Sequence, residues 1–299
     1  MIITTHTPRL LTQQGKRRAN QDAIYPLPDK WSPDAPSIFL VCDGVGGEAR
    51  GEVASRMACD LVGGSLAGLE KYRDEDIHTA IEVTKEAIAE FCAENPEAQG
   101  MATTLTLLAC DEQGALVAHL GDSRVYHFRA GEILFRTKDH SLVQELIDNG
   151  LLSPELADQH PQRNVVTRAL MAAPNDMQAS IFRIQDLRAD DLFLLCSDGI
   201  LESWTDEELR QLLTTTEHTD EAIIELIHER CAEHSRDNYT ACLVRLATVE
   251  GQAIPSPSNH TTDDTSLQRP FSKRAFLKEK MRQLKNGILN AFSDAPEQP

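Results

Sequence analysis

The sequence lacks the short motifs that mark several large classes of functional site. It has no glycine-rich dinucleotide loop, no Walker-type phosphate loop, no CxxC pair for zinc and no GxSxG nucleophile turn. Its seven cysteines form no close pair, and most of them stand inside apolar runs, as Cys42, Cys110, Cys196 and Cys242 do. An odd number of buried thiols is typical of a protein in a reducing compartment.

Long apolar runs and positive charge are also scarce. No run approaches the ~20 residues that a membrane-spanning helix needs, and the first residues show no basic start followed by an apolar core. The chain of 299 residues carries 29 Lys and Arg against 47 Asp and Glu, a net charge of -18. Nucleic acid and anionic membranes would repel such a chain. We therefore expect a cytoplasmic, monomeric protein that binds no nucleic acid.

Two apolar runs each end in Asp-Gly. Residues 37–42 contain no charge and stop at Asp43-Gly44, and residues 192–196 lead through Ser197 to Asp198-Gly199. Six uncharged residues rich in β-branched and aromatic types predict a strand covered on both faces. The glycines that follow allow a tight turn or a close approach to a ligand. Each run therefore predicts a buried strand that carries a carboxylate into a turn.

Three further acidic residues, Asp22, Asp122 and Asp237, stand in turns of their own. Carboxylates are the ligands that hard divalent cations prefer. Taken alone, the turn that holds Asp22 is typical of a structural surface turn. Asp122 is equally typical of a turn in which the side chain bonds to the nearby backbone. The two Asp-Gly strand ends favour a metal site.

The rest of the pattern mixes helices and strands. Helices are predicted at about 51–69, 74–91, 141–149, 206–213 and 220–232, and residues 101–136 predict an antiparallel meander of four strands. The piece between residues 150 and 173 predicts an irregular segment that contacts substrate. Composition changes near Val249, so we expect one catalytic domain over residues 1–249 and a disordered linker over residues 250–266.

The order of the acidic turns resembles the metal-dependent serine/threonine protein phosphatases of the type 2C (PPM) family, in particular the compact bacterial members. The resemblance covers residues 10–247 and lies in eight motifs. These are Arg17-Arg-Ala-Asn20-Gln-Asp22, Asp43-Gly-Val-Gly-Gly47, Gly100-Met-Ala-Thr-Thr104, Gly121-Asp-Ser-Arg124, Asp139-His-Ser141, Asn164-Val-Val-Thr-Arg168, Ser197-Asp-Gly199 and Asp237-Asn-Tyr-Thr240. Each motif is weak alone, but eight in the same order are specific.

The resemblance implies an α+β fold, a β-sandwich of two antiparallel sheets flanked by helices in αββα layers. It implies two Mn²⁺ or Mg²⁺ ions bridged by Asp43, with the Gly44 carbonyl, Asp198 and Asp237 as further ligands and Asp22 close by. Asp122 with Asp198 matches a third, weaker metal position. Two such ions about 3.5 to 4 Å apart lower the pKa of a bridging water, which can then attack phosphorus in line.

The implied activity is hydrolysis of phosphoserine and phosphothreonine in proteins, opposing a serine/threonine kinase. Arg17 is the expected phosphate clamp, because a guanidinium grips two phosphate oxygens at once. The alternatives are a metal-dependent hydrolase of small phosphorylated molecules and an inactive phosphatase-like adaptor.

The sequence departs from the family pattern in three places. Gln21 stands where many relatives have Glu, and Met171 stands where relatives often have Gly. Val45 stands where animal members have a His that is suspected to act as the general acid for the leaving oxygen. The proton for the leaving oxygen would then come from a metal-bound water or another group, for which His140 is a candidate.

Residues 267–299 reverse the sign of the charge. They contain seven Lys or Arg and three Asp or Glu, which gives a net charge of +4. Six apolar side chains from Phe271 to Phe292 fall largely on one helical face. A basic amphipathic helix on a tether predicts a docking element for a protein partner or a membrane surface.

Overall fold

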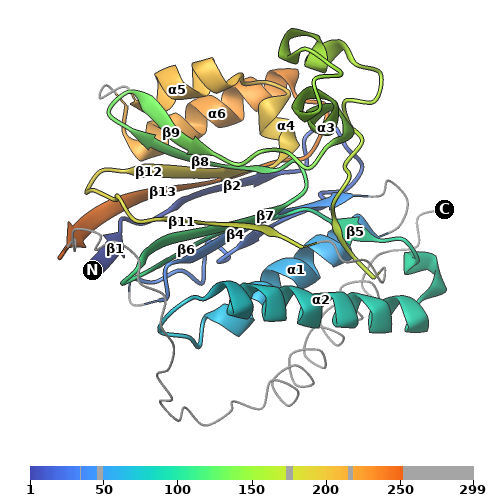
Figure 1. Cartoon of the computed structure of the whole chain (residues 1–299), viewed down its shortest axis with the longest axis horizontal. Coiled ribbons are helices and arrows are strands. Elements are labelled where there is room, and N and C mark those ends of the chain that lie inside the picture. Colours follow the sequence, from blue (N-terminus) through green and yellow to red (C-terminus); the bar gives the residue numbers. More distant parts are fainter. Residues whose placement is uncertain (34, 46–49, 173–177, 215–217, 252–299) are drawn as a thin grey trace.

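The computed structural model describes residues 1–33, 35–45, 50–172, 178–214 and 218–251, and it places two antiparallel sheets face to face (Figure 1). One sheet has six strands in the order β1-β13-β12-β8-β9, with β2 also paired to β13. Its strands are β1 (Ile2–Thr5), β2 (Arg9–Gln13), β8 (Arg124–Arg129), β9 (Glu132–Arg136), β12 (Leu192–Cys196) and β13 (Tyr239–Glu250). β13 is the longest because it pairs with β1, β2 and β12 along its length.

The second sheet has seven strands in the order β10-β5-β4-β6-β7-β11, with β3 paired to β4. Its strands are β3 (Asp22–Tyr25), β4 (Ile38–Val45), β5 (Ala102–Thr103), β6 (Leu105–Asp111), β7 (Gly114–Leu120), β10 (Leu170–Met171) and β11 (Ser180–Ile184). Residues 38–42 of β4 are all buried. The prediction of a strand covered on both faces is confirmed.

Helices cover the outer face of each sheet (Figure 1). α1 (Gly51–Leu66) and α2 (Asp74–Glu94) pack on the second sheet, whereas α4 (Asp198–Leu201), α5 (Asp206–Thr214) and α6 (Asp220–His234) pack on the first. A further helix, α3 (Leu142–Asp148), and two 3-10 turns, η1 (Pro96–Ala98) and η2 (Pro154–Gln159), lie in the connections. The predicted αββα layers are confirmed.

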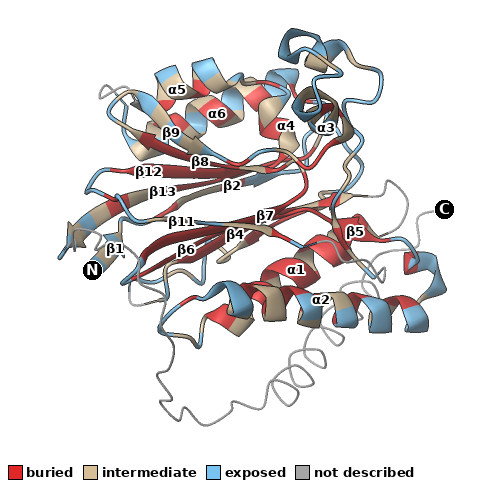
Figure 2. Ribbon diagram, in the orientation of Figure 1, coloured by how far each residue is buried: buried red, intermediate tan, exposed pale blue. Residues whose placement is uncertain are grey.

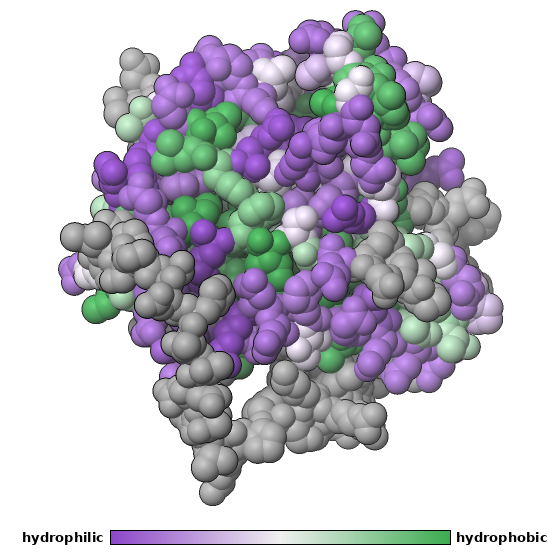
Figure 3. Space-filling view, in the orientation of Figure 1, coloured by the Kyte–Doolittle hydropathy of each residue, from purple (hydrophilic) through white to green (hydrophobic). Residues whose placement is uncertain are grey.

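Three apolar clusters hold the layers together. One lies between α1, α2 and the seven-stranded sheet, one between α5, α6 and the six-stranded sheet, and the third between the two sheets. Figure 2 shows the strands as the most completely buried part of the molecule. On the viewed face, which is largely hydrophilic, apolar surface gathers over β9 and β11, where Leu134 and Phe182 are exposed (Figure 3).

The predicted meander at 101–136 is wrong in one respect. β6 and β7 form a hairpin in one sheet, but β8 and β9 form a hairpin in the other. The chain crosses between the sheets at Gly121–Ser123, where Gly121 has a φ of 101°. Alternating polarity identifies a strand but does not say which sheet it joins. Asp122 therefore lies on the crossing between the two sheets.

The C-terminal predictions remain untested. β13 continues to Glu250, and the linker beyond Gly251 and the tail at 267–299 lie outside the described residues. Among the residues that are described, no helix has the length and apolar character to cross a membrane.

Phe193 of β12 should contribute strongly to the stability of the apolar layer between the sheets. Its side chain is fully buried and stacks on His127, with ring centroids 4.5 Å apart. We expect Phe193→Ala to lower the free energy of unfolding by about 3–5 kcal/mol, because it leaves a cavity in this layer. Leu134→Ala, at a position 49% exposed on β9, should change it by less than about 0.5 kcal/mol. Urea denaturation of both variants checks this, and equal effects would contradict the assignment of the core.

Candidate metal centre and active site

Asp22 and Asp43 face each other across neighbouring strands. β3 pairs with β4 so that Asp22 stands opposite Asp43. The backbone at Asp43 is held on its other side by Thr104, whose hydroxyl accepts from the Asp43 N–H at 2.9 Å and whose N–H donates to the Asp43 carbonyl at 2.8 Å. Thr103 donates its hydroxyl to the same carbonyl at 2.9 Å. The register of the strands therefore brings two carboxylates to one end of the sandwich.

Asp198 joins this pair from the other sheet. It follows β12 and begins α4, and the preceding Ser197 donates its hydroxyl to the Asp22 carboxylate at 2.8 Å. Ser197 is itself held by Thr240, whose N–H donates to the Ser197 hydroxyl at 3.0 Å. One buried serine thus ties the strand end that carries Asp198 to the carboxylate of Asp22.

Gly199 is needed where α4 meets the start of β13. A Cβ at this position would stand 1.9 Å from the carbonyl oxygen of Asn238. No real Cβ contact is that short, so the two backbones could not approach this closely with any other residue. The Asp-Gly pattern in the sequence reflects this contact.

Asp237 and Arg17 form the exposed side of the site. The Arg17 guanidinium pairs with the Asp237 carboxylate at 2.5 Å. Asn238, next in the chain, donates to the carbonyls of Gln14 and Ala19 at 2.7 and 2.8 Å and accepts from the Gln21 N–H at 2.9 Å. Asn238 therefore fixes the loop that carries Arg17 beside the acidic cluster.

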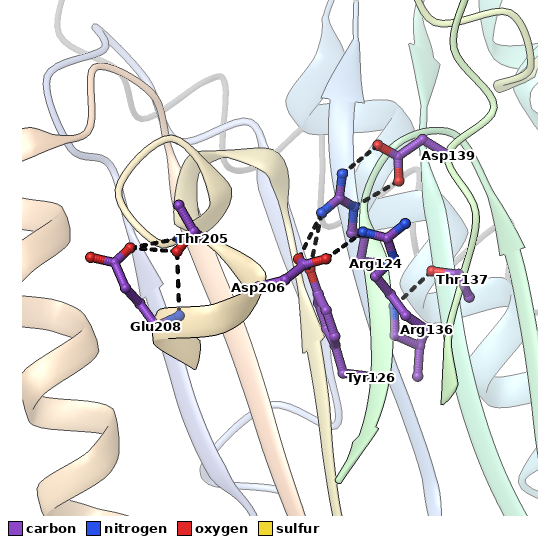
Figure 4. Close-up of polar contacts among 9 residues, drawn as sticks. Arg124, Tyr126, Arg136, Thr137, Asp139, Thr205, Asp206 and Glu208 are labelled. Atoms are coloured by element: carbon purple, nitrogen blue, oxygen red, sulfur yellow. Dashed lines mark hydrogen bonds and ion pairs between the residues drawn. The ribbon is translucent and has the colours of Figure 1, made fainter. Parts of the chain in front are cut away.

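A network of charged side chains begins two residues after Asp122 (Figure 4). Arg124, two residues later, makes two hydrogen bonds to the Asp139 carboxylate at 2.7 and 2.8 Å and one to Asp206 at 3.1 Å. Asp206, at the start of α5, also accepts from the buried Tyr126 hydroxyl at 2.7 Å and pairs with Arg136. The network joins the turn that carries Asp122 to the helical layer.

The carboxylates raise one another's pKa. Burial is the main cause at Asp43 and Asp198 and raises both pKa values well above the usual range, and each is raised further by neighbouring aspartates. The pKa of Asp22 is raised to about 7 by burial, and by Asp198 and Asp237. That of Asp122 is raised to about 6 by burial and by Asp139, while Arg124 opposes the shift. Full ionisation of the cluster therefore needs added positive charge.

These residues suit divalent cations. The buried Oδ1 atoms of Asp22 and Asp198 have no hydrogen-bond partner. Burial and neighbouring aspartates raise the pKa of Asp43 and Asp198 well above the usual range, which favours a proton on this pair. Within the described ranges, no three His, Cys, Asp or Glu side chains are already grouped to hold a metal. Cations would therefore replace the proton, satisfy the unpaired oxygens and draw the carboxylates together.

The environment of His140 speaks against its predicted role as a proton donor. Its Nδ1 accepts from the Gly121 N–H at 3.3 Å, and its Nε2 lies 2.9 Å from the Ser180 hydroxyl. Its ring stacks on His119 at 4.3 Å. Burial, together with the charges of His119 and Arg168, lowers its pKa to about 3. The imidazole is neutral near pH 7 and packs behind the Asp122 turn.

The three departures from the family pattern all lie beside the β3 and β4 strand ends. The side-chain amide of Gln21 donates to the Glu52 carboxylate at 3.5 Å, and the backbone carbonyl of Gln21 accepts from the Gly44 N–H at 3.1 Å. Val45 pairs with Ala102 of β5, and Ala102 pairs in turn with Met171 of β10. Val45 offers no proton donor, and Met171 forms a short edge strand.

Several residues with supporting roles were not identified from the sequence. Ser197, Thr104 and Asn238 occur in the quoted motifs, but they received no function there. All three are buried. Ser197 bonds to the carboxylate of Asp22, Thr104 to the backbone of Asp43, and Asn238 to the loop that carries Arg17. A polar residue inside an apolar strand end is the signal that could have marked them, since buried hydroxyls and amides need partners.

The raised pKa of Asp22 predicts how the metal-free protein responds to pH. An aspartate whose pKa rises from 3.8 to about 7 on folding contributes stability at low pH that is lost as the pH rises through 7. In chelator at pH 8, Asp22→Asn should therefore unfold at a higher temperature than wild type, and the difference should disappear near pH 4. The exposed control Asp29→Asn should track wild type at both pH values. An Asp22→Asn variant with no advantage at pH 8 would contradict the assignment.

The sequence matches known proteins over most of its length. Residues 13–235 match the protein phosphatase 2C family. The chain is 35% identical over 264 residues to the serine/threonine protein phosphatase PstP of Mycobacterium tuberculosis. This alignment covers 85% of this chain and 48% of PstP. It is 30% identical over 243 residues to the protein phosphatase PhpP of Streptococcus pneumoniae, and this alignment covers 79% of this chain and 96% of PhpP. The match thus spans about half the length of PstP but nearly all of PhpP.

Solved structures match the fold as well. The crystal structure of Mycobacterium tuberculosis PstP superposes with a TM-score of 0.71 at 30% identity, covering 82% of this chain and 100% of that one. A structure of the PstP catalytic domain in complex with two manganese ions has a TM-score of 0.69 at 27% identity, again covering 82% and 100%. The relatives named here are protein phosphatases, and PstP is a serine/threonine protein phosphatase. The chain belongs to the protein phosphatase 2C family.

Proposed function

We propose that the protein hydrolyses phosphoserine and phosphothreonine in other proteins and uses two divalent cations, Mn²⁺ or Mg²⁺. The observation that carries the proposal is the convergence of Asp22, Asp43 and Asp198 from both sheets, with buried carboxylate oxygens that have no partner. The manganese complex of PstP supports the choice of metal. A kinase that phosphorylates the same residues would be its functional opponent.

Asp43, Asp198, Asp237 and the Gly44 carbonyl would hold the two ions, and Asp22 would add negative charge beside them. Asp122 and Asp198 would hold a third ion. When bound, the cations supply an activated water and neutralise charge on the phosphoryl group. The chain's own task is to hold its carboxylates in one place, which the hydrogen bonds of Thr104 and Ser197 support.

Arg17 would bind the phosphate. Its partner Asp237 is one of the proposed metal ligands, so metal binding at Asp237 would compete with the ion pair and free guanidinium N–H groups for phosphate oxygens. With Val45 in place of a histidine, and His140 neutral and engaged elsewhere, the proton for the leaving oxygen would come from water.

Loss of a charged metal ligand should abolish turnover. We expect Asp43→Asn and Asp198→Asn each to lower kcat/KM for a phosphothreonine peptide with Mn²⁺ by about a hundredfold or more, since a lost ligand charge removes several kcal/mol of stabilisation. Both variants should keep the wild-type circular dichroism spectrum, and Asp29→Asn should remain active.

The same assay separates the alternative functions. Wild-type activity confined to sugar phosphates or nucleotides would favour a small-molecule hydrolase, and no Mn²⁺-dependent activity on any substrate would favour an inactive adaptor. Near-normal activity of Asp43→Asn or Asp198→Asn would contradict the proposed metal site.

The phosphate contact of Arg17 can be tested through the two kinetic constants. If Arg17 holds phosphate in both the ground state and the transition state, Arg17→Ala should raise KM more than it lowers kcat, and Arg17→Lys should be impaired too because an ammonium cannot form two parallel bonds. Arg188→Ala, at a side chain 65% exposed, is the control. An unchanged KM with intact metal binding would remove Arg17 from the site.

A further inference from the structure

Basic side chains are concentrated beside the acidic site, in a chain where they are scarce. Lys16, Arg17 and Arg18 follow one another in the loop after β2, and Arg236 precedes Asp237. All four are exposed. We call Lys16, Arg18 and Arg236 the basic rim, which leaves out Arg17 because the proposed function already uses it. In a chain with a net charge of -18, such a cluster beside five aspartates needs an explanation.

The loop that carries the rim is held firmly in place. Gly15 has a φ of +58°, and a Cβ there would lie 2.1 Å from the carbonyl oxygen of Asp237. Gln14 donates its amide to the Arg17 carbonyl at 2.8 Å, and Asn238 binds both ends of the loop through its two hydrogen bonds. The backbone of the loop is therefore held in place, and little backbone order has to be created when a ligand binds.

Within the described residues, no carboxylate forms an ion pair with a side chain of the rim. Lys16 donates to the backbone carbonyl of Glu233 at 2.7 Å. Throughout the part of the chain that the structure describes, neither Arg18 nor Arg236 has a carboxylate partner for its side chain. The nearby Glu202 accepts from the backbone N–H of Arg236 at 2.8 Å. The two guanidinium groups are thus available to a ligand that arrives at the site.

We propose that the basic rim selects phosphoproteins with a second anionic group, a carboxylate or another phosphate, within about three residues of the scissile phosphate. This inference rests on the proposed function. An extended peptide advances about 3.3 Å per residue, so such a group lies within about 10 Å of the scissile phosphorus. That distance is comparable to the Debye length of about 10 Å at moderate ionic strength. Elsewhere the negative charge of the protein would repel the same peptide.

The test compares three phosphothreonine peptides of equal length with Mn²⁺. One has neutral flanking residues, one has acidic residues near the phosphothreonine, and one has a second phosphothreonine there. Wild type should show a higher kcat/KM for both anionic peptides than for the neutral one. Arg18→Gln and Arg236→Gln should each lower that ratio by about twofold to fivefold, as expected for an exposed ion pair.

A matched control removes one positive charge at the opposite end of the sheet. Lys30 is exposed and lies between the end of β3 and the start of β4, whereas Asp43 lies near the end of β4. Lys30→Gln should leave the ratio unchanged. Raising the ionic strength until the Debye length falls to about 3 Å should bring the wild-type ratio toward one.

The outcomes separate this inference from the proposed function. If wild type hydrolyses all three peptides at similar kcat/KM, or if Lys30→Gln lowers the ratio as much as the arginine variants do, the rim is not a selective surface. A response to the acidic peptide alone, or to the doubly phosphorylated peptide alone, identifies which anion is recognised and supports the rim. Failure of wild type to hydrolyse any phosphopeptide would contradict the proposed function itself.

Discussion

Repulsion between buried carboxylates is the constraint on which the rest of this site depends. Asp22, Asp43 and Asp198 arrive from two different sheets, and burial together with neighbouring aspartates raises the pKa of each. Burying several like charges costs far more than one strand or turn contributes to stability. The cluster is therefore compatible with a folded protein only while protons or cations offset its charge. The proposed metal dependence would follow from the fold, because the same sandwich that buries the acids also keeps them from separating.

The supporting contacts explain why the fold can hold such a cluster. Ser197 bonds to both Asp22 and Thr240, and therefore fastens one sheet to the other at the site. Thr104 bonds to the Asp43 backbone and to the Ser123 hydroxyl at 2.8 Å, which joins β4 to the turn that carries Asp122. These are hydrogen bonds from buried groups to buried groups, and they are costly to leave unmade. The proposed ligands are thus positioned by the sandwich itself, while Arg17 and its neighbours stand on a loop at the edge.

The strand ends and the eight motifs were readable from the sequence because local chemistry determines them. A run of buried apolar residues that stops at Asp43-Gly44 has few other structural explanations, and the layered fold followed from the family resemblance. The crossing at Gly121–Ser123 was not readable, because alternation along β7 and β8 carries no information on sheet partners. The surroundings of His140 were not readable for a similar reason. Its environment is set by His119 and Ser180, which are distant in the sequence.

If the site binds metal as proposed, cations replace protons within one carboxylate cluster. Titration of Mn²⁺ into the metal-free protein by calorimetry, repeated in buffers of different ionisation enthalpy, measures the protons released on binding. Near pH 6 we expect net proton release, which should diminish as the pH rises above the pKa of Asp22, about 7. Binding without proton release at pH 6, or proton release that does not change with pH, would contradict it.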